Sequence, residues 1–292
     1  MKGLLIVNSF LNINKFSDLY DFLSKASRKY EVDLLIKTTD EFCFNLNNKF
    51  DEYKDVDFIL FWDKDVYLAQ RLESLGFKVF NSAKAIEICD NKALTALKLN
   101  EANIKTPKTI LAPKTFEGVL YNNFKFLDTA EKELGYPMII KEVFGSFGKQ
   151  VYLVNNRDEA TKLINDLGYK DFLMQEFIEE SSGRDIRINV VGGKVISAMG
   201  RVNENDFRSN ISNGGVMKQV NLTKNQETIA INACKALGLD FAGVDVLYGK
   251  EGPIICEVNS NPHFKSSLEC TGIDLSEEII KYILEVLKWK DF

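Results

Sequence analysis

Two neighbouring stretches near the end of the chain decide how its fold is interpreted: Phe241-Ala-Gly-Val-Asp245-Val246 and Ile254-Ile-Cys-Glu257-Val-Asn259. Both are typical of β-strands, and strand side chains alternate between faces, so Glu257 and Asn259 point to the same side. If the strands pair as a hairpin, Asp245 joins them. Two carboxylates and one amide oxygen on a sheet suit Mg²⁺ carrying ATP phosphates. Taken alone, the same residues also fit a solvated, polar sheet face.

The first 84 residues alternate between strand and helix patterns. A small doubly wound α/β unit is therefore predicted. No G-x-G-x-x-G follows the first strand, which excludes a dinucleotide fingerprint. We expect three domains, at 1–84, 85–174 and 175–292. Within the first domain we expect strands at 2–7, 32–36, 56–61 and 78–80 and helices at 16–29 and 65–75.

The rest of the chain predicts two further lobes that mix helices and strands. The terminal helix has an apolar stripe that we expect to pack into a core. One predicted helix opens at Asp90-Asn91-Lys92 and ends near Asn103. Two others begin after Asn156 and after Thr223, and the terminal helix spans 275–287. The predicted strands are 136–141, 151–154, 172–177, a hairpin of 186–191 with 194–199, and the two opening stretches.

Composition narrows the function classes. The 45% hydrophobic and 27% charged residues are ordinary for a soluble globular protein, and a net charge of −5 gives nucleic-acid binding no support. The apolar runs are too short for a signal peptide or a membrane span, so we expect a cytoplasmic protein with no membrane or nucleic-acid partner. Five dispersed cysteines without a C-x-x-C pair, and one histidine, argue against a Cys/His metal cluster.

A glycine-containing turn, Gly145-Ser146-Phe147-Gly148-Lys149, lies between two predicted strands. Glycines permit sharp turns whose N–H groups can surround phosphate oxygens. Lys141, at the end of an apolar strand just before this turn, can reach a phosphate as a point charge. The turn is not a Walker A loop, because no Gly-Lys-Ser/Thr leads into a helix. A flexible hairpin tip and a lysine reaching water are the alternatives.

Two further motifs follow along the chain. Gln175-Glu-Phe-Ile178 leaves a strand, and such a segment can offer backbone groups to an adenine edge; an ordinary strand exit is the alternative. Arg187, Arg201 and Arg208 fall within a short span, and forked guanidinium groups suit carboxylates and phosphates. Isolated surface ion pairs are the alternative for these arginines.

The order of the motifs resembles the ATP-grasp superfamily, and within it the ribosomal-protein-S6-modification-like (RimK-like) glutamate ligases. The resemblance covers about Ala85 to the C-terminus, and the N-terminal unit is similar to a pre-ATP-grasp domain. It implies an α/β fold of α+β lobes, in which two lobes clasp ATP. The ordered motifs are Asp90-x-Lys92, Pro137 to Lys141, Gly145-Ser-x-Gly148, Gln175 to Ile178, Asp185-Ile-Arg187, Asp206 to Asn210, Gly243-Val-Asp245 and Glu257-Val-Asn259.

The resemblance also implies roles for individual residues. The nucleotide residues would be Lys92 and Lys141 at the phosphates, Gly145, Ser146 and Gly148 in a closing loop, Glu176 and Phe177 at adenine, and Asp185 at the ribose. The metal residues would be Asp245, Glu257 and Asn259, holding Mg²⁺ (two ions bridged by Glu257, with Mn²⁺ as an alternative). The residues lining the reaction centre would be Arg187, Arg201, Arg208 and Asn210.

The family's chemistry is a two-step ligation. A substrate carboxylate takes the γ-phosphate of ATP, and an amine then displaces phosphate to leave an amide. Phosphoryl transfer needs positioning and charge neutralisation more than a protein nucleophile, which suits a chain with one histidine. We expect a small-molecule carboxylate and amine, such as an amino acid or peptide. The alternatives are a small-molecule kinase and a non-catalytic nucleotide-binding protein. Family members are often dimers or tetramers, so self-association stays open.

The chain departs from the S6-modification pattern at two places. Those ligases usually have a Pro-Gly turn after the metal pair, whereas this chain has Pro262-His263-Phe264-Lys265-Ser266-Ser267. That segment borders the acceptor site in the family, so substrate choice is expected to differ there. The glycine loop ends in Lys149-Gln150, where a further glycine is common.

Overall fold

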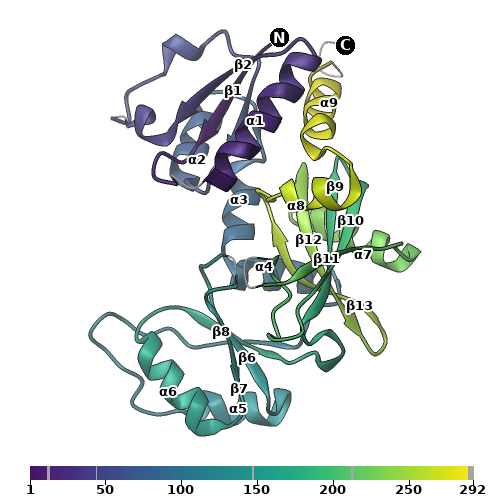
Figure 1. Ribbon diagram of the computed structural model, residues 1–292. Helices are drawn as coiled ribbons and strands as arrows, with labels where there is room; N and C mark the ends of the chain where they lie inside the picture. Colours follow the sequence, from purple (N-terminus) through teal and green to yellow (C-terminus); the bar gives the residue numbers. More distant parts are fainter. Residues whose placement is uncertain (12–13, 44, 147, 212–213, 289–292) are drawn as a thin grey trace.

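Three β-sheets form in the part of the chain that the computed structural model describes, residues 1–11, 14–43, 45–146, 148–211 and 214–288 (Figure 1). One belongs to the N-terminal domain, one to the central lobe and one to the C-terminal lobe. In Figure 1 the N-terminal domain stands at the top and the central lobe at the bottom, with the C-terminal lobe between them. The mixed α/β fold of lobes is thereby confirmed.

The N-terminal sheet is parallel and has the strand order β2-β1-β3-β4. Its strands are β1 (Lys2–Val7), β2 (Asp33–Thr38), β3 (Phe58–Trp62) and β4 (Val79–Phe80). Its helices are α1 (Asn14–Lys29), α2 (Val66–Ser74) and α3 (Ala83–Asp90), with short 3₁₀ turns at Thr39–Phe42 and Asp51–Tyr53.

Both faces of the central strands β1 and β3 are buried, as the doubly wound prediction requires, whereas the edge strand β2 is largely exposed. Alternate residues of β1 enter different cores: Leu5 and Val7 pack with α1, and Leu4 and Ile6 pack with α2. The first core also takes the terminal helix α9 (Leu275–Lys288), which lies beside α1 in Figure 1. The predicted apolar stripe of that helix is therefore core packing, and it completes the N-terminal domain.

The central lobe is an antiparallel sheet with the order β5-β8-β6-β7. Two helices cover one face of it, with Leu127, Ile164 and Met138 in the shared core. The strands are β5 (Thr109–Leu111), β6 (Met138–Glu142), β7 (Val151–Val154) and β8 (Phe172–Glu176), and the helices are α5 (Lys125–Leu134) and α6 (Arg157–Leu167).

The C-terminal lobe is an antiparallel sheet with the order β11-β10-β9-β12-β13. Its strands are β9 (Arg184–Val191), β10 (Lys194–Val202), β11 (Val216–Gln219), β12 (Phe241–Gly249) and β13 (Gly252–Asn259), preceded by a 3₁₀ turn at Glu179–Ser181. Its helices are α7 (Lys224–Ala236), packed in one core with residues of α4 (Lys92–Glu101), and α8 (Lys265–Thr271), which contacts β10 and β11.

The helix predicted to open at Asp90-Asn91-Lys92 is confirmed as α4, but the separate helix before it was not predicted. The stretch expected to open at Asp90 is the boundary between two helices: α3 ends at Asp90, and α4 begins at Lys92. Asn91 is the N-cap of α4, because its side chain accepts a 2.9 Å hydrogen bond from the Leu94 N–H. Helix α3 has its own cap in Ser82, a start signal that the sequence prediction missed. The domain limits stay predictions; residue 84 lies within α3 and residue 174 within β8.

Candidate active site

The two opening stretches pair as an antiparallel hairpin, as predicted. Asp245 lies opposite Glu257, and Gly243 lies opposite Asn259, with a register shift after Asp245. Asp245 is buried, whereas Glu257 and Asn259 are partly exposed. Asn259 donates a long hydrogen bond of 3.4 Å to the Gly243 carbonyl. The three oxygen-bearing side chains therefore lie together on one rigid hairpin.

A buried ion-pair network surrounds Asp245. Strand β9 places Arg187 directly beside it, and the guanidinium donates from Nε and Nη2 to the two carboxylate oxygens at 2.5 and 2.9 Å. Arg201 bridges Asp245, at 2.9 Å, and both oxygens of Asp185. Burial raises the pKa of Asp245, but the attraction of Arg187 and Arg201 outweighs burial and holds it below its ordinary value.

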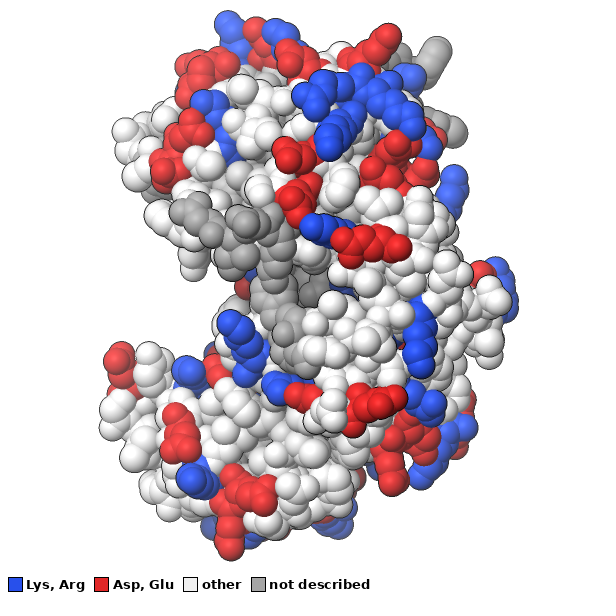
Figure 2. Space-filling view, viewed as in Figure 1, with Lys and Arg blue, Asp and Glu red and all other residues white. Residues whose placement is uncertain are grey.

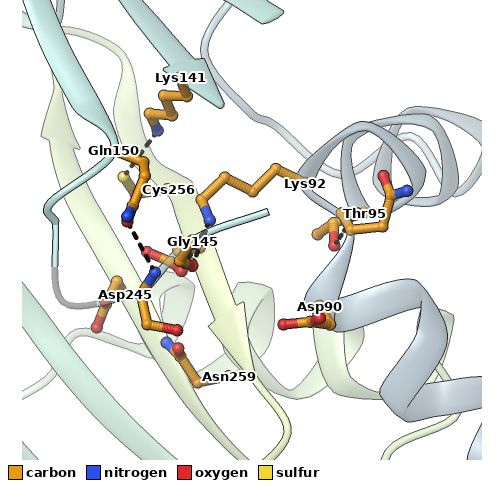
Figure 3. Close-up of polar contacts among 12 residues, drawn as sticks. Asp90, Lys92, Thr95, Lys141, Gly145, Gln150, Asp245, Cys256 and Asn259 are labelled. Carbon is orange, nitrogen blue, oxygen red and sulfur yellow. Dashed lines mark hydrogen bonds and ion pairs between the residues drawn. The ribbon is translucent and has the colours of Figure 1, made fainter. Parts of the chain in front are cut away.

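Two lysines approach this hairpin from different elements (Figure 3). Lys92, at the start of α4, donates to the Gly145 carbonyl at 2.8 Å, and its Nζ lies 3.9 Å from Oε1 of Glu257. Lys141, buried on β6, has its Nζ 3.8 Å from Sγ of Cys256. Burial is the main reason why the pKa of Lys92 is lowered, and the positive charge of Lys141 adds to that effect.

The described residues of the glycine loop, which do not include Phe147, contact both the N-terminal domain and the C-terminal lobe. Lys64 of the N-terminal domain contacts Oγ of Ser146 at 3.2 Å, and Arg208 of the C-terminal lobe donates to the Gly148 carbonyl at 2.8 Å. Gln150, where a glycine is common in the family, accepts a 3.2 Å hydrogen bond from the Ser146 N–H. Its side chain thus closes the loop on itself.

The predicted adenine segment lies where β8 ends. Oε1 of Glu176 accepts from the Lys108 N–H at 2.8 Å, so this carboxylate already pairs with the chain entering β5. The Phe177 ring packs edge-on against Phe207, with centroids 6.4 Å apart and an interplanar angle of 72°. Phe207 was not among the predicted site residues, although it directly precedes Arg208 in the chain.

Two cavities meet at the metal residues. The smaller, of about 110 Å³, and the larger, of about 560 Å³, share Arg201, Asn210, Asp245 and Glu257 in their walls. The structure brings every predicted site residue into one or both walls. The smaller cavity adds Lys141, Gly148, Glu176, Phe177, Asp185 and Arg208, and the larger adds Lys92, Gly145, Ser146, Arg187 and Asn259.

The larger cavity extends into the N-terminal domain, which the sequence prediction did not include in the site. Its walls there contain Tyr20 of α1 and Trp62 and Asp63 at the end of β3. Ligands of parallel sheets bind beyond the carboxyl ends of the strands, and that rule was the signal for the last two. His263 also lines this cavity, 6.1 Å from the Phe16 ring between ring centroids.

Comparison with known families agrees with this geometry. The model of the RimK-like ATP-grasp domain matches residues 89–283. The chain belongs to the RimK-like ATP-grasp family. Among the relatives of this chain, an uncharacterized Mycoplasma pneumoniae protein is 32% identical over 94% of this chain and 96% of its own length. A probable alpha-L-glutamate ligase of Vibrio atlanticus is 37% identical over 74% of this chain and 70% of its own length.

Solved structures share the ATP-grasp fold. D-alanine–D-alanine ligase of Bacillus anthracis, complexed with ATP, has a TM-score of 0.74 at 22% identity and covers 99% of each chain. A RimK-domain ATP-grasp protein of Sphaerobacter thermophilus has a TM-score of 0.73 at 19% identity, over 97% of this chain and 99% of its own.

The face of this RimK-like chain seen in Figure 2 is hollowed between the N-terminal domain and the central lobe.

Proposed function

We propose that this ATP-dependent carboxylate–amine ligase joins an amino acid or peptide carboxylate to an amine through an acyl-phosphate. The observation that carries the proposal is the meeting of two cavities at Asp245, Glu257, Arg201 and Asn210. The smaller is lined by residues expected to hold the nucleotide, and the larger is in the size range of small-molecule sites. The γ-phosphate would then lie at the junction, within reach of the carboxylate substrate.

The nucleotide would enter beside β8. Phe177 and Phe207 offer aromatic surface to adenine, and Lys141 and Lys92 lie on the path from there to the metal residues. The glycine loop, held by Arg208 and Lys64, would cover the phosphates and keep water from the acyl-phosphate. Asp185 lines the same cavity, and both of its oxygens accept hydrogen bonds from Arg201. Its side chain would have to turn away from Arg201 to contact the ribose.

The donor set fits Mg²⁺. Asp245, Glu257 and Asn259 offer oxygen ligands only, as hard cations prefer, and phosphate oxygens and water would supply the others. Among the described residues no group of three or more His, Cys, Asp or Glu could hold a metal without such help. When bound, the ion would neutralise the phosphate charge. The family resemblance predicts two further details, namely a second ion held together with the first by Glu257, and the use of Mn²⁺ as an alternative.

The reaction needs no protein nucleophile. In the first step a substrate carboxylate oxygen forms a bond to the γ-phosphorus, and the bond to ADP breaks. In the second step the amine nitrogen bonds to the acyl carbon, phosphate leaves with the bonding electron pair, and the amine loses a proton. Arg187 and Arg201, with Arg208 and Asn210, would stabilise the charge on the transferring phosphoryl group.

Glutamate is the first amino acid to test. The Vibrio relative is named a probable alpha-L-glutamate ligase, and a Danio rerio relative, 32% identical over 77% of this chain and 55% of its own length, is named beta-citrylglutamate synthase B. His263 and Ser266, in the segment that departs from the family pattern, line the larger cavity. We therefore place substrate choice partly in that segment.

The cytoplasmic location and self-association stay predictions; no helix in the described ranges is long and apolar enough to cross a membrane.

The test is substrate-dependent ADP release with amino acids and peptides, combined with product mass. Glu257→Ala is expected to abolish ADP release without changing the fold. Glu251→Ala is the matched control, because Glu251 lies at the exposed tip of the same hairpin. Unchanged turnover in Glu257→Ala would overturn the proposal. ADP release with a phosphorylated product, and no amide with any amine, would indicate a kinase; ATP binding without any turnover would indicate a non-catalytic protein.

A further inference from the structure

One carboxylate in the larger cavity has no cationic partner among the side chains that the structure describes. Asp63 follows β3 and is 7% exposed. Its Oδ1 accepts a 2.8 Å hydrogen bond from the Asp65 N–H, and no lysine or arginine within the described ranges pairs with it. The neighbouring Lys64 is directed elsewhere, to Asp90 and Ser146. Burial of a carboxylate without a counter-charge costs free energy, so a bound cation would stabilise Asp63.

Two aromatic side chains, Trp62 and Tyr20, line the same cavity as Asp63. Trp62 is held by stacking on Phe241, with centroids 5.5 Å apart and an interplanar angle of 17°, and by an edge contact with Phe264 at 6.1 Å. Tyr20, in the same wall, has its pKa raised to about 12, mainly by burial and further by the negative charge of Asp63. Aromatic faces attract organic cations and also accept a carbon chain.

The opposite end of the same cavity carries both charges, because Asp245 and Glu257 line it together with three cations. Arg187, Arg201 and Lys92 line it next to the metal hairpin. The cavity thus has Asp63 and two aromatic side chains at the end formed by the N-terminal domain. At the reaction centre it has guanidinium groups that can donate to a carboxylate, and a bound metal ion would offset the charges of Asp245 and Glu257 there. A ligand that spans it would present a positive group to the first end and a carboxylate to the second.

We propose that the larger cavity binds a zwitterionic carboxylic acid, an amino acid or short peptide, with its ammonium group on Asp63 and its reacting carboxylate toward Arg187. This inference rests on the proposed function for the direction of the carboxylate. Asp63 acts as a specificity-determining residue, and Trp62 and Tyr20 contact the carbon atoms beside the ammonium group. The acids that this enzyme activates would therefore need a free amino group.

The experiment measures equilibrium binding, in the presence of Mg²⁺ and a non-hydrolysable ATP analogue. Each probe is a matched pair: an amino acid or dipeptide, and its N-acetyl derivative. Wild-type protein is expected to bind the free amines roughly 10- to 100-fold more tightly, the range for a hydrogen bond to a charged group. Asp63→Asn keeps an oxygen for the Asp65 N–H and removes the charge, so it should bind both members of each pair equally.

Asp21→Asn is the control, because it makes the same charge change on the exposed surface of α1. It should retain the wild-type preference. Thermal unfolding without ligand gives a second readout: Asp63→Asn should be at least as stable as wild type, because an unpaired buried charge has been removed. Lower stability in Asp63→Asn, with an unchanged preference for free amines, would show that Asp63 has a structural role only.

Binding separates this inference from the proposed function. If ADP release depends on carboxylic acids, but wild type and Asp63→Asn bind free and N-acetylated acids alike, the ligase stands and the ammonium site is overturned. If no acid supports turnover, yet wild type prefers free amines and Asp63→Asn does not, the ammonium site stands and the ligase proposal fails.

Discussion

Arg187 and Asp245 lie side by side on adjacent strands, and the guanidinium contacts both oxygens of the carboxylate. The residue proposed as a metal ligand is therefore also the anion that balances two buried guanidinium groups, because Arg201 contacts it as well. Removal of this carboxylate would leave the buried Arg187 without its anionic partner and Arg201 with Asp185 alone. The structural and the chemical roles of Asp245 thus depend on the same two oxygens.

Asp245→Asn is expected to lower the free energy of unfolding by about 3–5 kcal/mol, the range for breaking a buried ion pair from one side. Because the pKa of Asp245 is lower in the folded than in the unfolded protein, its stabilisation is complete above the unfolded value, near 4. The stabilisation is lost as the pH falls through the folded value. Urea unfolding between pH 7 and 3, without nucleotide or metal, should therefore show the difference from wild type shrinking below about pH 4.

Asp206→Asn is the control for this prediction. Asp206 pairs with Arg208, but both side chains are partly exposed, so the expected loss is at most about 1 kcal/mol. Equal losses for the two variants would contradict the importance of burial.

Lys92 should make ATP use sensitive to alkaline pH. Its lowered pKa means that the charge needed for phosphate binding is lost at a lower pH than for a free lysine, near 10.4. Values of kcat/KM for ATP report groups of the free enzyme, so they should fall earlier in wild type than in Lys92→Arg, whose guanidinium stays charged. Lys98→Arg, on the exposed face of the same helix, should keep the wild-type profile. Identical profiles in wild type and Lys92→Arg would contradict the role of Lys92.

Gly243 leaves room for Arg187. A Cβ at this position would lie 2.9 Å from Nη1 of Arg187 and 3.0 Å from Cβ of Pro262. Gly243→Ala is therefore expected to displace the guanidinium, to lower kcat at least tenfold and to destabilise the fold by about 1–3 kcal/mol. In an Arg187→Met background the same substitution should cost less stability, and the double-mutant cycle measures that difference. Additive effects would locate the strain at Pro262 instead.

Asn81 joins the N-terminal domain to the C-terminal lobe. It is fully buried, and its amide donates to the carbonyls of Phe241 and Ser260 at 3.0 and 2.8 Å. Its Oδ1 accepts from the N–H groups of Asp240 and Phe241 at 2.7 and 3.2 Å. Asn81→Ala should destabilise the protein by about 3 kcal/mol or more, because these backbone groups lose their partners.

Asn81→Asp should be worse than Asn81→Ala, since a carboxylate cannot donate to the two carbonyls and would be buried without a cation. Denaturant midpoints of the two variants decide this. A milder effect for Asn81→Asp would show that the donor contacts matter little.

The sequence predicted the hairpin well because its signal is local. A strand, a turn and a second strand with a period of two place Asp245, Glu257 and Asn259 together without knowledge of the rest of the molecule. The position of Lys92 required more, since it depends on how α4 lies against the glycine loop. Only the ordered motifs of the family predicted that lysine in the site.

Other features depend on contacts between distant segments and could not be predicted from local patterns. The pairing of β9 with β12, which brings Arg187 to Asp245, is a choice among several strand orders. The boundary between α3 and α4 is set by the Asn91 cap, which a continuous apolar period conceals. The burial of Asp63 in the larger cavity depends on how distant segments pack together, and no local pattern predicts it.

Helix α9 has a consequence for the order in which the molecule is made. The first sheet is synthesised early, yet the core on one of its faces includes Leu275, Ile279 and Ile283 of the last helix. Until those residues emerge from the ribosome, α1 covers only part of that face, and the part that α9 occupies stays exposed to water or to chaperones. The N-terminal domain is thus contiguous in space but not in the chain, and its folding is completed only after residues 275–288 have been made.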